Sequence, residues 1–337
     1  MRRNTVVKII SLIAVITLVM PLAGCFLEEF YIEPAASSST SGSSASFSFT
    51  TNPYVRTNFD TVKNPYFAML TDKEKDAYSN IYEELLAGNS KFEAKVSLSG
   101  DELTKAIDAV LYDHPELFWL DNTYGYTYDP NTGDVKEITF DFFDFADTPE
   151  KLESAKIQFN TAVDLIVAKA LAYSTVVERE LYIHDYICEN TVYDDSAKYN
   201  QSAYSVIVLH KSVCAGYTRA FQYLMQKTGA TCYYVTGRTD GLNNSQAVGG
   251  GDGSHSWNMI LIEGGYYNVD CLWDDTASET YGSSIYPFFN LTDAAFIYHA
   301  RIDMAFNLPS CTATDYKYSN QFGSTIEADS LIFEDAA

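Results

Sequence analysis

The chain has 337 residues, enough for one large domain or two smaller ones. Its composition, with 47% hydrophobic, 15% aromatic and 20% charged residues, is typical of a folded globular protein and excludes a disordered one. The formal net charge of −23 argues against a nucleic-acid-binding protein, because no basic stripe is present to neutralise phosphates.

Residues 1–24 have the pattern of a targeting segment. The basic side chains Arg2, Arg3 and Lys8 precede an apolar run from residue 9 to about residue 22, and the sequence Leu22-Ala23-Gly24-Cys25 follows. This tetrapeptide resembles the lipobox of bacterial lipoproteins, which implies cleavage before Cys25 and lipidation of that cysteine. An uncleaved transmembrane anchor is the alternative, but the run is shorter than the roughly 20 apolar residues that a span needs. We therefore expect a bacterial lipoprotein, lipid-anchored to the membrane at the cell surface.

Residues 25–53 are predicted to form a tether between the lipidated cysteine and the folded part of the chain. The centre of this segment is Ser39-Thr40-Ser41-Gly42-Ser43-Ser44. Such a composition cannot bury enough apolar surface to fold, so we expect a flexible linker.

Residues 54–147 are predicted to form a smaller α+β N-terminal region. The sequence Thr71-Asp72-Lys73-Glu74 is a capping box that opens a helix, which Gly88 is placed to end. A second helix is expected over residues 101–112. Alternating tyrosines at 124–128 and an apolar run at 135–143 flank a turn sequence, which predicts a hairpin.

Residues 148–337 are predicted to form the catalytic domain. Two helices are expected first, from Thr148-Pro149 to about residue 172 and from about residue 176 to residue 189. A third helix is expected to begin close to Cys214, where unpaired N–H groups and the positive end of the helix dipole favour a thiolate. Gly216 is expected to leave room for a substrate backbone. This stretch alone does not separate a reactive Cys214 from a buried one.

Residues 253–275 are predicted to form a hairpin that brings His255 and Asp270 to one face. A two-residue turn at Glu263-Gly264 places them diagonally, with Cβ atoms about 7 Å apart, and puts Trp257 opposite Asp270. In this register the second strand continues beyond Asp270. The glycine pair that follows Glu263 is the easier turn, but it separates the acid from the histidine by about four residues. We therefore expect the first turn, because a carboxylate that orients a histidine lets the ring exchange protons with a thiol.

Three short blocks together resemble the transglutaminase-like superfamily. They are Val213-Cys214-Ala215-Gly216-Tyr217, His255-Ser256-Trp257-Asn258 and Tyr267-Asn268-Val269-Asp270, and their order and spacing also match. The resemblance covers about residues 150–275. It implies a papain-like α+β core, in which a helix bearing the cysteine packs on an antiparallel sheet. The segment Asp113-His114-Pro115-Glu116-Leu117-Phe118-Trp119 also resembles one found upstream of this domain in bacterial relatives.

The resemblance implies a catalytic triad with Cys214 as nucleophile, His255 as its base and Asp270 as the residue that orients the histidine. The backbone N–H of Cys214 is the expected oxyanion donor. Trp257 is a candidate to wall the site or to support the oxyanion, with core packing as the alternative. Tyr204 is a candidate for substrate contact, and His210 is a lesser one.

Two departures from the family pattern stand near this site. Cys271-Leu272 follow Asp270, where the family often has small or β-branched residues. The glycine-rich loop at 237–254 is interpreted as a mobile lid beside His255, with an ordinary surface insertion as the alternative.

The other cysteines leave alternatives open. Cys188, Cys232, Cys271 and Cys311 could form disulfides or remain free thiols. His184 and Cys188 lie four residues apart and could ligate a metal, but a structural role for His184 is favoured because no second pair has metal-site spacing.

The sequence thus predicts a surface-anchored, transglutaminase-like cysteine acyltransferase or hydrolase that forms a thioester intermediate. A cysteine peptidase or deamidase of the same fold, and a non-catalytic binding or scaffold module, are the alternatives. We expect no cofactor, no metal and no nucleic acid; the expected partners are a protein or peptide substrate, cell-wall peptide included, and the membrane. Substrate identity, transfer against hydrolysis, and oligomeric state stay open.

Overall fold

The computed structural model describes residues 16–19, 55–239 and 253–331. Cys25, the predicted tether and residues 240–252 of the predicted lid lie outside these ranges, so the corresponding expectations stay predictions. Within the described residues no helix is long and apolar enough to cross a membrane. The elements in chain order are β1 (Ile16–Val19), α1 (Pro65–Ala68), α2 (Asp72–Leu86), β2 (Lys91–Glu93), α3 (Gly100–Asp113), β3 (Leu120–Tyr128), β4 (Val135–Phe142), α4 (Pro149–Ala170), α5 (Val176–Asn190), β5 (Val192–Tyr193), α6 (Ala203–Ile207), β6 (Lys211–Ser212), α7 (Cys214–Lys227), β7 (Thr231–Thr239), β8 (Ser254–Ile262), β9 (Gly265–Val269), α8 (Cys271–Tyr281), β10 (His299–Arg301), η1 (Asp303–Asn307), α9 (Tyr318–Gln321) and η2 (Ala328–Ser330).

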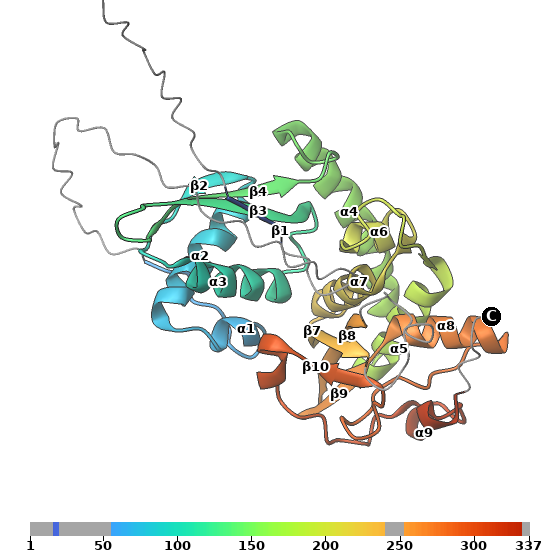
Figure 1. The fold of residues 1–337 in the computed structure, drawn as a ribbon. Coiled ribbons are helices and arrows are strands. Elements are labelled where there is room, and N and C mark those ends of the chain that lie inside the picture. Colours follow the sequence, from blue (N-terminus) through green and yellow to red (C-terminus); the bar gives the residue numbers. More distant parts are fainter. Residues whose placement is uncertain (1–15, 20–54, 240–252, 332–337) are drawn as a thin grey trace, which may run out of the picture.

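The first sheet belongs to the N-terminal part of the chain and has the order β1-β3-β4-β2 (Figure 1). Strand β1, which falls inside the predicted signal peptide, pairs antiparallel with β3. Helix α2 begins with the predicted capping box, in which Thr71 accepts from Glu74 N and the Glu74 side chain accepts from Thr71 N. Ser99 and Glu102 form a second capping box at α3. The predicted helices and hairpin of this region are confirmed.

The second sheet has the order β10-β7-β8-β9 and is antiparallel throughout. Helix α7, which begins at Cys214, packs against β7 and β8, and α5 and α8 pack against α7 (Figure 1). The predicted fold class, mixed helix and antiparallel sheet with the cysteine-bearing helix on the sheet, is confirmed.

The two sheets are joined by contacts that fix the N-terminal region against the second sheet. The Tyr66 hydroxyl donates to the Tyr234 carbonyl at 2.6 Å, and Gln222 Nε2 donates to the Tyr112 carbonyl at 2.8 Å. The rings of Tyr112 and Tyr234 stack with centroids 5.3 Å apart. These four residues come from α1, α3, α7 and β7, so α1 and α3 of the N-terminal region contact both the second sheet and α7. The predicted boundary at residues 147/148 stays a prediction.

The hairpin of β8 and β9 has the turn that the sequence predicted. Ile262 pairs with Gly265, and Glu263 and Gly264 have φ values of 48° and 84°, both in the left-handed region that this tight turn requires. Glutamate is a poor residue for positive φ, yet the register that joins Asp270 to His255 is the one adopted.

The predicted continuation of the second strand beyond Asp270 is wrong. The ladder ends with Asn258 paired to Val269, and Asp270 is the N-cap of α8, with its Oδ1 accepting from Trp273 N at 3.1 Å. Trp257 therefore has no ladder partner at Asp270. The physical reason is that an aspartate side chain satisfies an N–H group of the first helical turn, which turns the chain into a helix at this point.

Candidate active site

Cys214 is the first residue of α7 and has no exposed surface. Its N-cap residue, Val213, provides no side-chain hydrogen bond to the first turn. The Thr218 hydroxyl donates to the Cys214 carbonyl at 2.8 Å and lies 3.1 Å from the Ser256 hydroxyl of β8. Asn258 Nδ2 donates to the Thr218 carbonyl at 3.0 Å. These bonds attach the start of α7 to the strand that carries His255.

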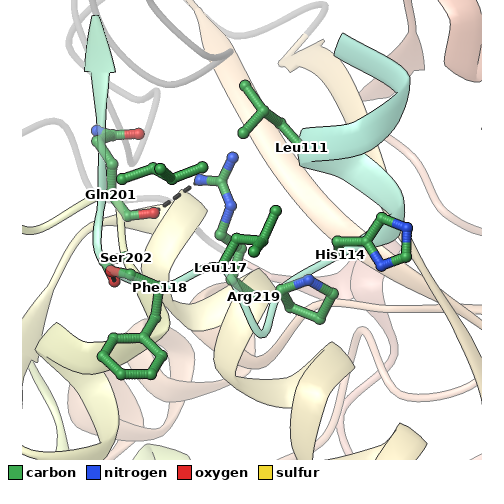
Figure 2. Close-up of a pocket in the computed structure, with 9 residues that line it drawn as sticks. Leu111, His114, Leu117, Phe118, Gln201, Ser202 and Arg219 are labelled. Carbon is green, nitrogen blue, oxygen red and sulfur yellow. Dashed lines mark hydrogen bonds between the residues drawn. The ribbon is translucent and has the colours of Figure 1, made fainter. Parts of the chain in front are cut away.

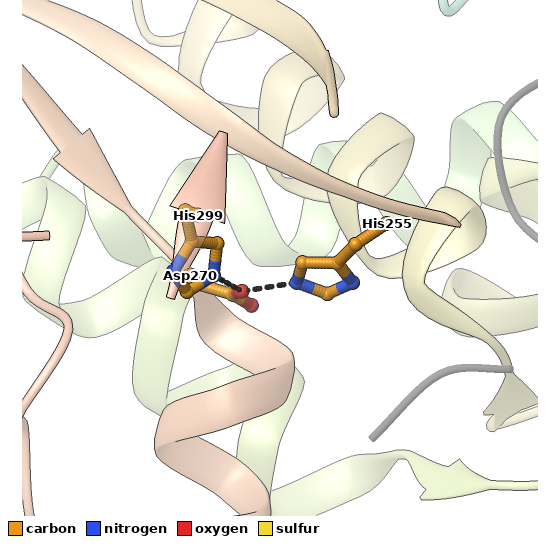
Figure 3. Close-up of side chains that lie close together, drawn as sticks. All are labelled: His255, Asp270 and His299. Carbon is orange, nitrogen blue, oxygen red and sulfur yellow. Dashed lines mark hydrogen bonds and ion pairs between the residues drawn. The ribbon is translucent and has the colours of Figure 1, made fainter. Parts of the chain in front are cut away.

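His255 and Asp270 are brought together as the sequence predicted, although not through a strand pair. His255 Nε2 lies 2.5 Å from Asp270 Oδ2 (Figure 3). Strand β8 supplies the histidine, and the N-cap position of α8 supplies the carboxylate. Both side chains are buried, with exposed fractions of 0% and 2%. A buried ionised pair at this distance is a strong, charge-assisted hydrogen bond.

The electrostatics of this pair favour a charged ring and a charged carboxylate. Burial opposes the charge on His255, but the charge and hydrogen bond of Asp270, together with the Cys214 side chain, raise the pKa of His255 to about 10. Burial likewise opposes the charge on Asp270, but His255 and, to a smaller extent, His299 hold the pKa of this carboxyl well below its usual range. The pair is therefore an imidazolium and a carboxylate at neutral pH.

The second nitrogen of the His255 ring is available for proton exchange. Nδ1 makes no hydrogen bond of ordinary geometry within the described part of the chain. The Cys214 thiol is close enough to the ring to contribute to the raised pKa of His255. The arrangement thus has a thiol at a helix N-terminus, an imidazole beside it and a carboxylate behind the imidazole.

A second histidine, His299, lies on the same carboxylate and was missed by the sequence reasoning. Its Nε2 is 3.1 Å from Asp270 Oδ2, and its Nδ1 is 2.9 Å from the Ile297 carbonyl oxygen (Figure 3). It starts β10, a short edge strand that pairs with β7. No motif in the sequence around His299 announces this contact, which exists only because β10 folds back beside β7.

The donor atoms of His255, Asp270 and His299 all lie within 4.8 Å of one another, and nitrogen and carboxylate oxygen are donors that zinc accepts. Two ligand atoms around a tetrahedral zinc ion are separated by about 3.3 Å, given bond lengths near 2.0 Å. The 2.5 Å separation between His255 and Asp270 is that of a hydrogen bond. The three side chains are therefore arranged as a hydrogen-bonded cluster.

Three other predicted site residues have structural roles. The indole Nε1 of Trp257 donates to Asn268 Oδ1 at 3.1 Å, so this N–H is not free to support an oxyanion. The Trp257 ring packs beside the His255 ring, with centroids 6.1 Å apart.

A Cβ on Gly216 would lie 1.9 Å from Ser212 Oγ, so the absence of a side chain makes room for Ser212 and not for substrate. The predicted substrate role of Gly216 is wrong for this steric reason.

Tyr204 belongs to the core between α4, α6 and the N-terminal region. Its hydroxyl donates to Gln158 Oε1 at 2.8 Å, and its ring stacks on Phe145 with centroids 4.3 Å apart. Because both the ring and the hydroxyl are used internally, the predicted substrate contact is wrong. His210 is exposed and has a positive φ of 60°.

The five cysteines within the described residues, Cys188, Cys214, Cys232, Cys271 and Cys311, are all free thiols. Burial raises the pKa of Cys188 to about 11 and of Cys311 to about 12, and raises those of Cys232 and Cys271 well above the ordinary value. These four thiols therefore stay protonated at neutral pH.

His184 and Cys188, which the sequence offered as a candidate metal pair, instead make hydrogen bonds within the protein core. His184 Nε2 lies 3.0 Å from Asp274 Oδ2, and the Cys188 thiol donates to the Cys271 carbonyl at 3.3 Å. His184 is buried and joins α5 to α8, as the favoured structural interpretation predicted.

A separate cavity of about 20 Å³ is lined by residues of α3, of the segment that follows it and of α7, and none of the triad lines it (Figure 2). Its polar feature is Arg219, which donates to the Gln201 carbonyl at 2.7 Å and lies over the Tyr234 ring at 5.0 Å. Figure 2 shows the guanidinium between Leu111, Leu117 and Gln201. This volume has room for about one water molecule, so the cavity is not a substrate site.

Residues 166–271 match the family model of the transglutaminase-like superfamily, and this range contains Cys214, His255 and Asp270. The chain carries a transglutaminase-like domain. The fold of this domain is generally that of thiol enzymes, either transglutaminases or cysteine proteases.

Two curated proteins resemble this chain over about half of its length. The human kyphoscoliosis peptidase is 24% identical over 178 residues, which cover 50% of this chain and 26% of the relative. The mouse kyphoscoliosis peptidase is 22% identical over 184 residues, covering 52% and 27%. The chain thus spans about a quarter of the length of these relatives. A crystal structure of a TGase aligns with a TM-score of 0.29 and 14% identity, covering 57% of this chain and 47% of the other.

Proposed function

We propose that the transglutaminase-like domain is a thiol enzyme acting on carboxamide or peptide bonds, with Cys214 as nucleophile, His255 as proton carrier and Asp270 as the residue that orients the ring. The observation that carries this proposal is the 2.5 Å hydrogen bond from His255 Nε2 to Asp270. This bond fixes the ring and leaves Nδ1 to exchange a proton with the Cys214 thiol.

The raised pKa of His255 favours the state in which the Cys214 proton has moved to the ring, so the reacting form is a thiolate beside an imidazolium. The sulfur attacks the carbonyl carbon, and the electron pair of the C=O bond moves to oxygen. When the tetrahedral intermediate collapses, the C–N bond breaks and the ammonia or amine leaves with a proton from the imidazolium. An amine or water then gives a proton to His255 and attacks the thioester carbon. Collapse of this second tetrahedral intermediate breaks the C–S bond and releases the Cys214 thiolate beside the imidazolium.

The start of α7 is suited to stabilise the oxyanion. Val213 offers no capping side chain, and the Gly216 N–H donates to the Val213 carbonyl at 3.0 Å, so the N–H groups of Cys214 and Ala215 are the ones left for another acceptor. The backbone N–H of Cys214 is the nearest of them to its own sulfur, and the helix dipole adds positive potential. Since neither Cys214 nor His255 has exposed surface, substrate binding requires the site to open.

Two sub-classes of this function remain, transfer to an amine and hydrolysis by water. The curated relatives bear the name of a peptidase, which supports hydrolysis of a peptide bond as the second candidate. A glutamine-containing peptide separates the outcomes when ammonia release is measured with and without a primary amine. Incorporation of the amine identifies a transferase, conversion of glutamine to glutamate identifies a deamidase, and backbone cleavage identifies a peptidase.

The test of the enzyme itself is selective alkylation of the full chain with iodoacetamide at neutral pH, followed by mass spectrometry of each cysteine peptide. We expect stoichiometric labelling at Cys214 and loss of that labelling in His255→Ala. Cys232→Ala is the matched control, because Cys232 is also a buried free thiol. Equal, slow labelling of all cysteines would instead favour a non-catalytic scaffold.

We further propose that the chain is a bacterial surface lipoprotein whose domain is tethered to the membrane through Cys25. The support is the sequence Leu22-Ala23-Gly24-Cys25 after a basic and then apolar segment. Metabolic labelling with a palmitate analogue should mark the wild type and not Cys25→Ser, and the variant should leave the membrane fraction after processing. Equal labelling of both proteins would overturn this assignment.

A further inference from the structure

The carboxylate of Asp270 is held at both oxygens, and a different element holds each. Oδ1 accepts from the backbone N–H of Trp273 at 3.1 Å, the N-cap bond of α8. Oδ2 lies 3.1 Å from Nε2 of His299 in β10 and 2.5 Å from Nε2 of His255 in β8. The same oxygen is thus shared by two imidazole rings (Figure 3).

The hydrogen-bond partners of His299 determine where its proton is. Nδ1 lies 2.9 Å from the Ile297 carbonyl, which only accepts. Nε2 faces the ionised carboxylate of Asp270, which also only accepts. A neutral ring has one proton for these two acceptors, and the bond to the charged carboxylate is the stronger, so the proton belongs on Nε2. A proton on Nδ1 would instead leave the lone pair of Nε2 facing the carboxylate.

An aromatic wall surrounds His299 and restricts its ring. The ring centroid is 4.0 Å from that of Phe296, 4.5 Å from that of Trp273 and 5.0 Å from that of Trp257. The side chain has no exposed surface. Water therefore does not compete for Nε2. Burial lowers the pKa of His299, against the pull of Asp270, so the ring is neutral at neutral pH and carries one proton.

We propose that His299 is a positioning residue, which locks the Asp270 carboxylate in the orientation that aims Oδ2 at His255. This inference rests on the proposed function, because it concerns the same triad. The N-cap bond alone holds one oxygen and permits the carboxylate to pivot about it. A second donor on the other oxygen removes that freedom, and the orientation of a catalytic imidazole depends on its carboxylate.

Two substitutions separate this role from simple packing. The amide nitrogen of glutamine reaches the position of Nε2, so His299→Gln keeps the bond to Asp270. The amide nitrogen of asparagine reaches only the position of Nδ1, so His299→Asn faces the Ile297 carbonyl and loses the bond to Asp270. Both variants are smaller than histidine and remove the ring, so they share the loss of packing.

We expect His299→Asn to lower kcat, or the rate of Cys214 alkylation, by about tenfold to a hundredfold, the worth of one hydrogen bond to a charged group. KM should not change, because the polar atoms of His299 bond to Asp270 and lie against the Ile297 carbonyl. His299→Gln should stay within a few-fold of wild type, with a thermal midpoint close to that of His299→Asn. The proposal would be overturned if both variants lost rate equally, or if the loss of rate followed the fall in the thermal midpoint of unfolding.

A measurement on the wild-type chain does not depend on the variants folding. With ¹⁵N-labelled histidine, the His299 ring should show a proton on Nε2, and the signal of this proton should disappear in Asp270→Asn. Absence of that proton in the wild type would refute the positioning role. If Cys214 of the wild type is unreactive and His255→Ala changes nothing, the proposed function fails together with this inference. If Cys214 of the wild type is reactive and His299→Asn has the same rate, only the positioning role of His299 is refuted.

Discussion

Asp270→Asn is the substitution that most directly tests the triad. Asparagine is itself a good N-cap, and its Oδ1 can still accept from Trp273 N, so α8 should begin at the same residue. The amide nitrogen then faces His255 Nε2, which must accept instead of donate. The proton of the neutral ring moves to Nδ1, and the nitrogen that should take the thiol proton from Cys214 is occupied.

The magnitude follows from the electrostatics of the pair. The pKa of His255 is raised to about 10, against an ordinary value of about 6.5, and each unit corresponds to about 1.4 kcal/mol. After the opposing effect of burial, the environment of the ring therefore stabilises the imidazolium by a net amount of roughly 5 kcal/mol, and Asp270 is the largest favourable contributor. We expect turnover to fall by about a thousandfold to ten-thousandfold, with little change in KM.

The assay is turnover of the glutamine-containing peptide, measured as ammonia release as a function of pH, because alkylation needs only the thiolate and not the imidazolium acid. In the wild type the imidazolium persists until pH rises through about 10, so the reaction that needs it as an acid should decline only above that value. In Asp270→Asn this decline should shift to lower pH by two units or more, because the carboxylate no longer holds the proton on His255.

Asp275→Asn is the matched control. Asp275 is a second carboxyl of α8, it accepts from the Tyr217 hydroxyl at 2.8 Å, and it is not bonded to His255. This control should keep both the rate and the pH profile. Our reasoning is refuted if Asp270→Asn retains wild-type turnover, or if its alkaline limb remains near pH 10.

Two further predictions concern stability. Gly216→Ala should destabilise the fold by about 1–3 kcal/mol, because the added Cβ would lie 1.9 Å from Ser212 Oγ and 2.7 Å from the Asn200 carbonyl; an unchanged urea midpoint would contradict this packing. Glu180→Gln should make stability less dependent on pH. Burial raises the pKa of Glu180 to about 8. The contribution of protonated Glu180 to the free energy of unfolding is therefore complete below about pH 4 and is lost as pH rises to about 8. Urea unfolding should therefore show little gain from the glutamine at pH 4 and a gain on the order of a few kcal/mol at pH 8, and an equal effect at both would refute this.

The sequence by itself determined the local elements and the chemistry of the site. The capping box at Thr71, the placement of Cys214 at a helix start and the turn at Glu263-Gly264 are all short-range features, and all three are present. Capping side chains, apolar spacing and turn residues act over a few positions, so they can be identified without tertiary information. The choice of turn also depended on requiring Asp270 to reach His255, a functional constraint that local propensity opposed.

The tertiary structure decided how the site is assembled. Asp270 meets His255 from the cap of α8 and not from a continued strand, because its side chain completes the first turn of that helix. His299 joins the same carboxylate from β10, and no local pattern encodes a contact between residues 29 positions apart in two different elements. Gly216 is also explained only by the side chains packed around it. Such contacts depend on which surfaces meet when the chain folds back on itself, and residue spacing along the sequence does not contain that information.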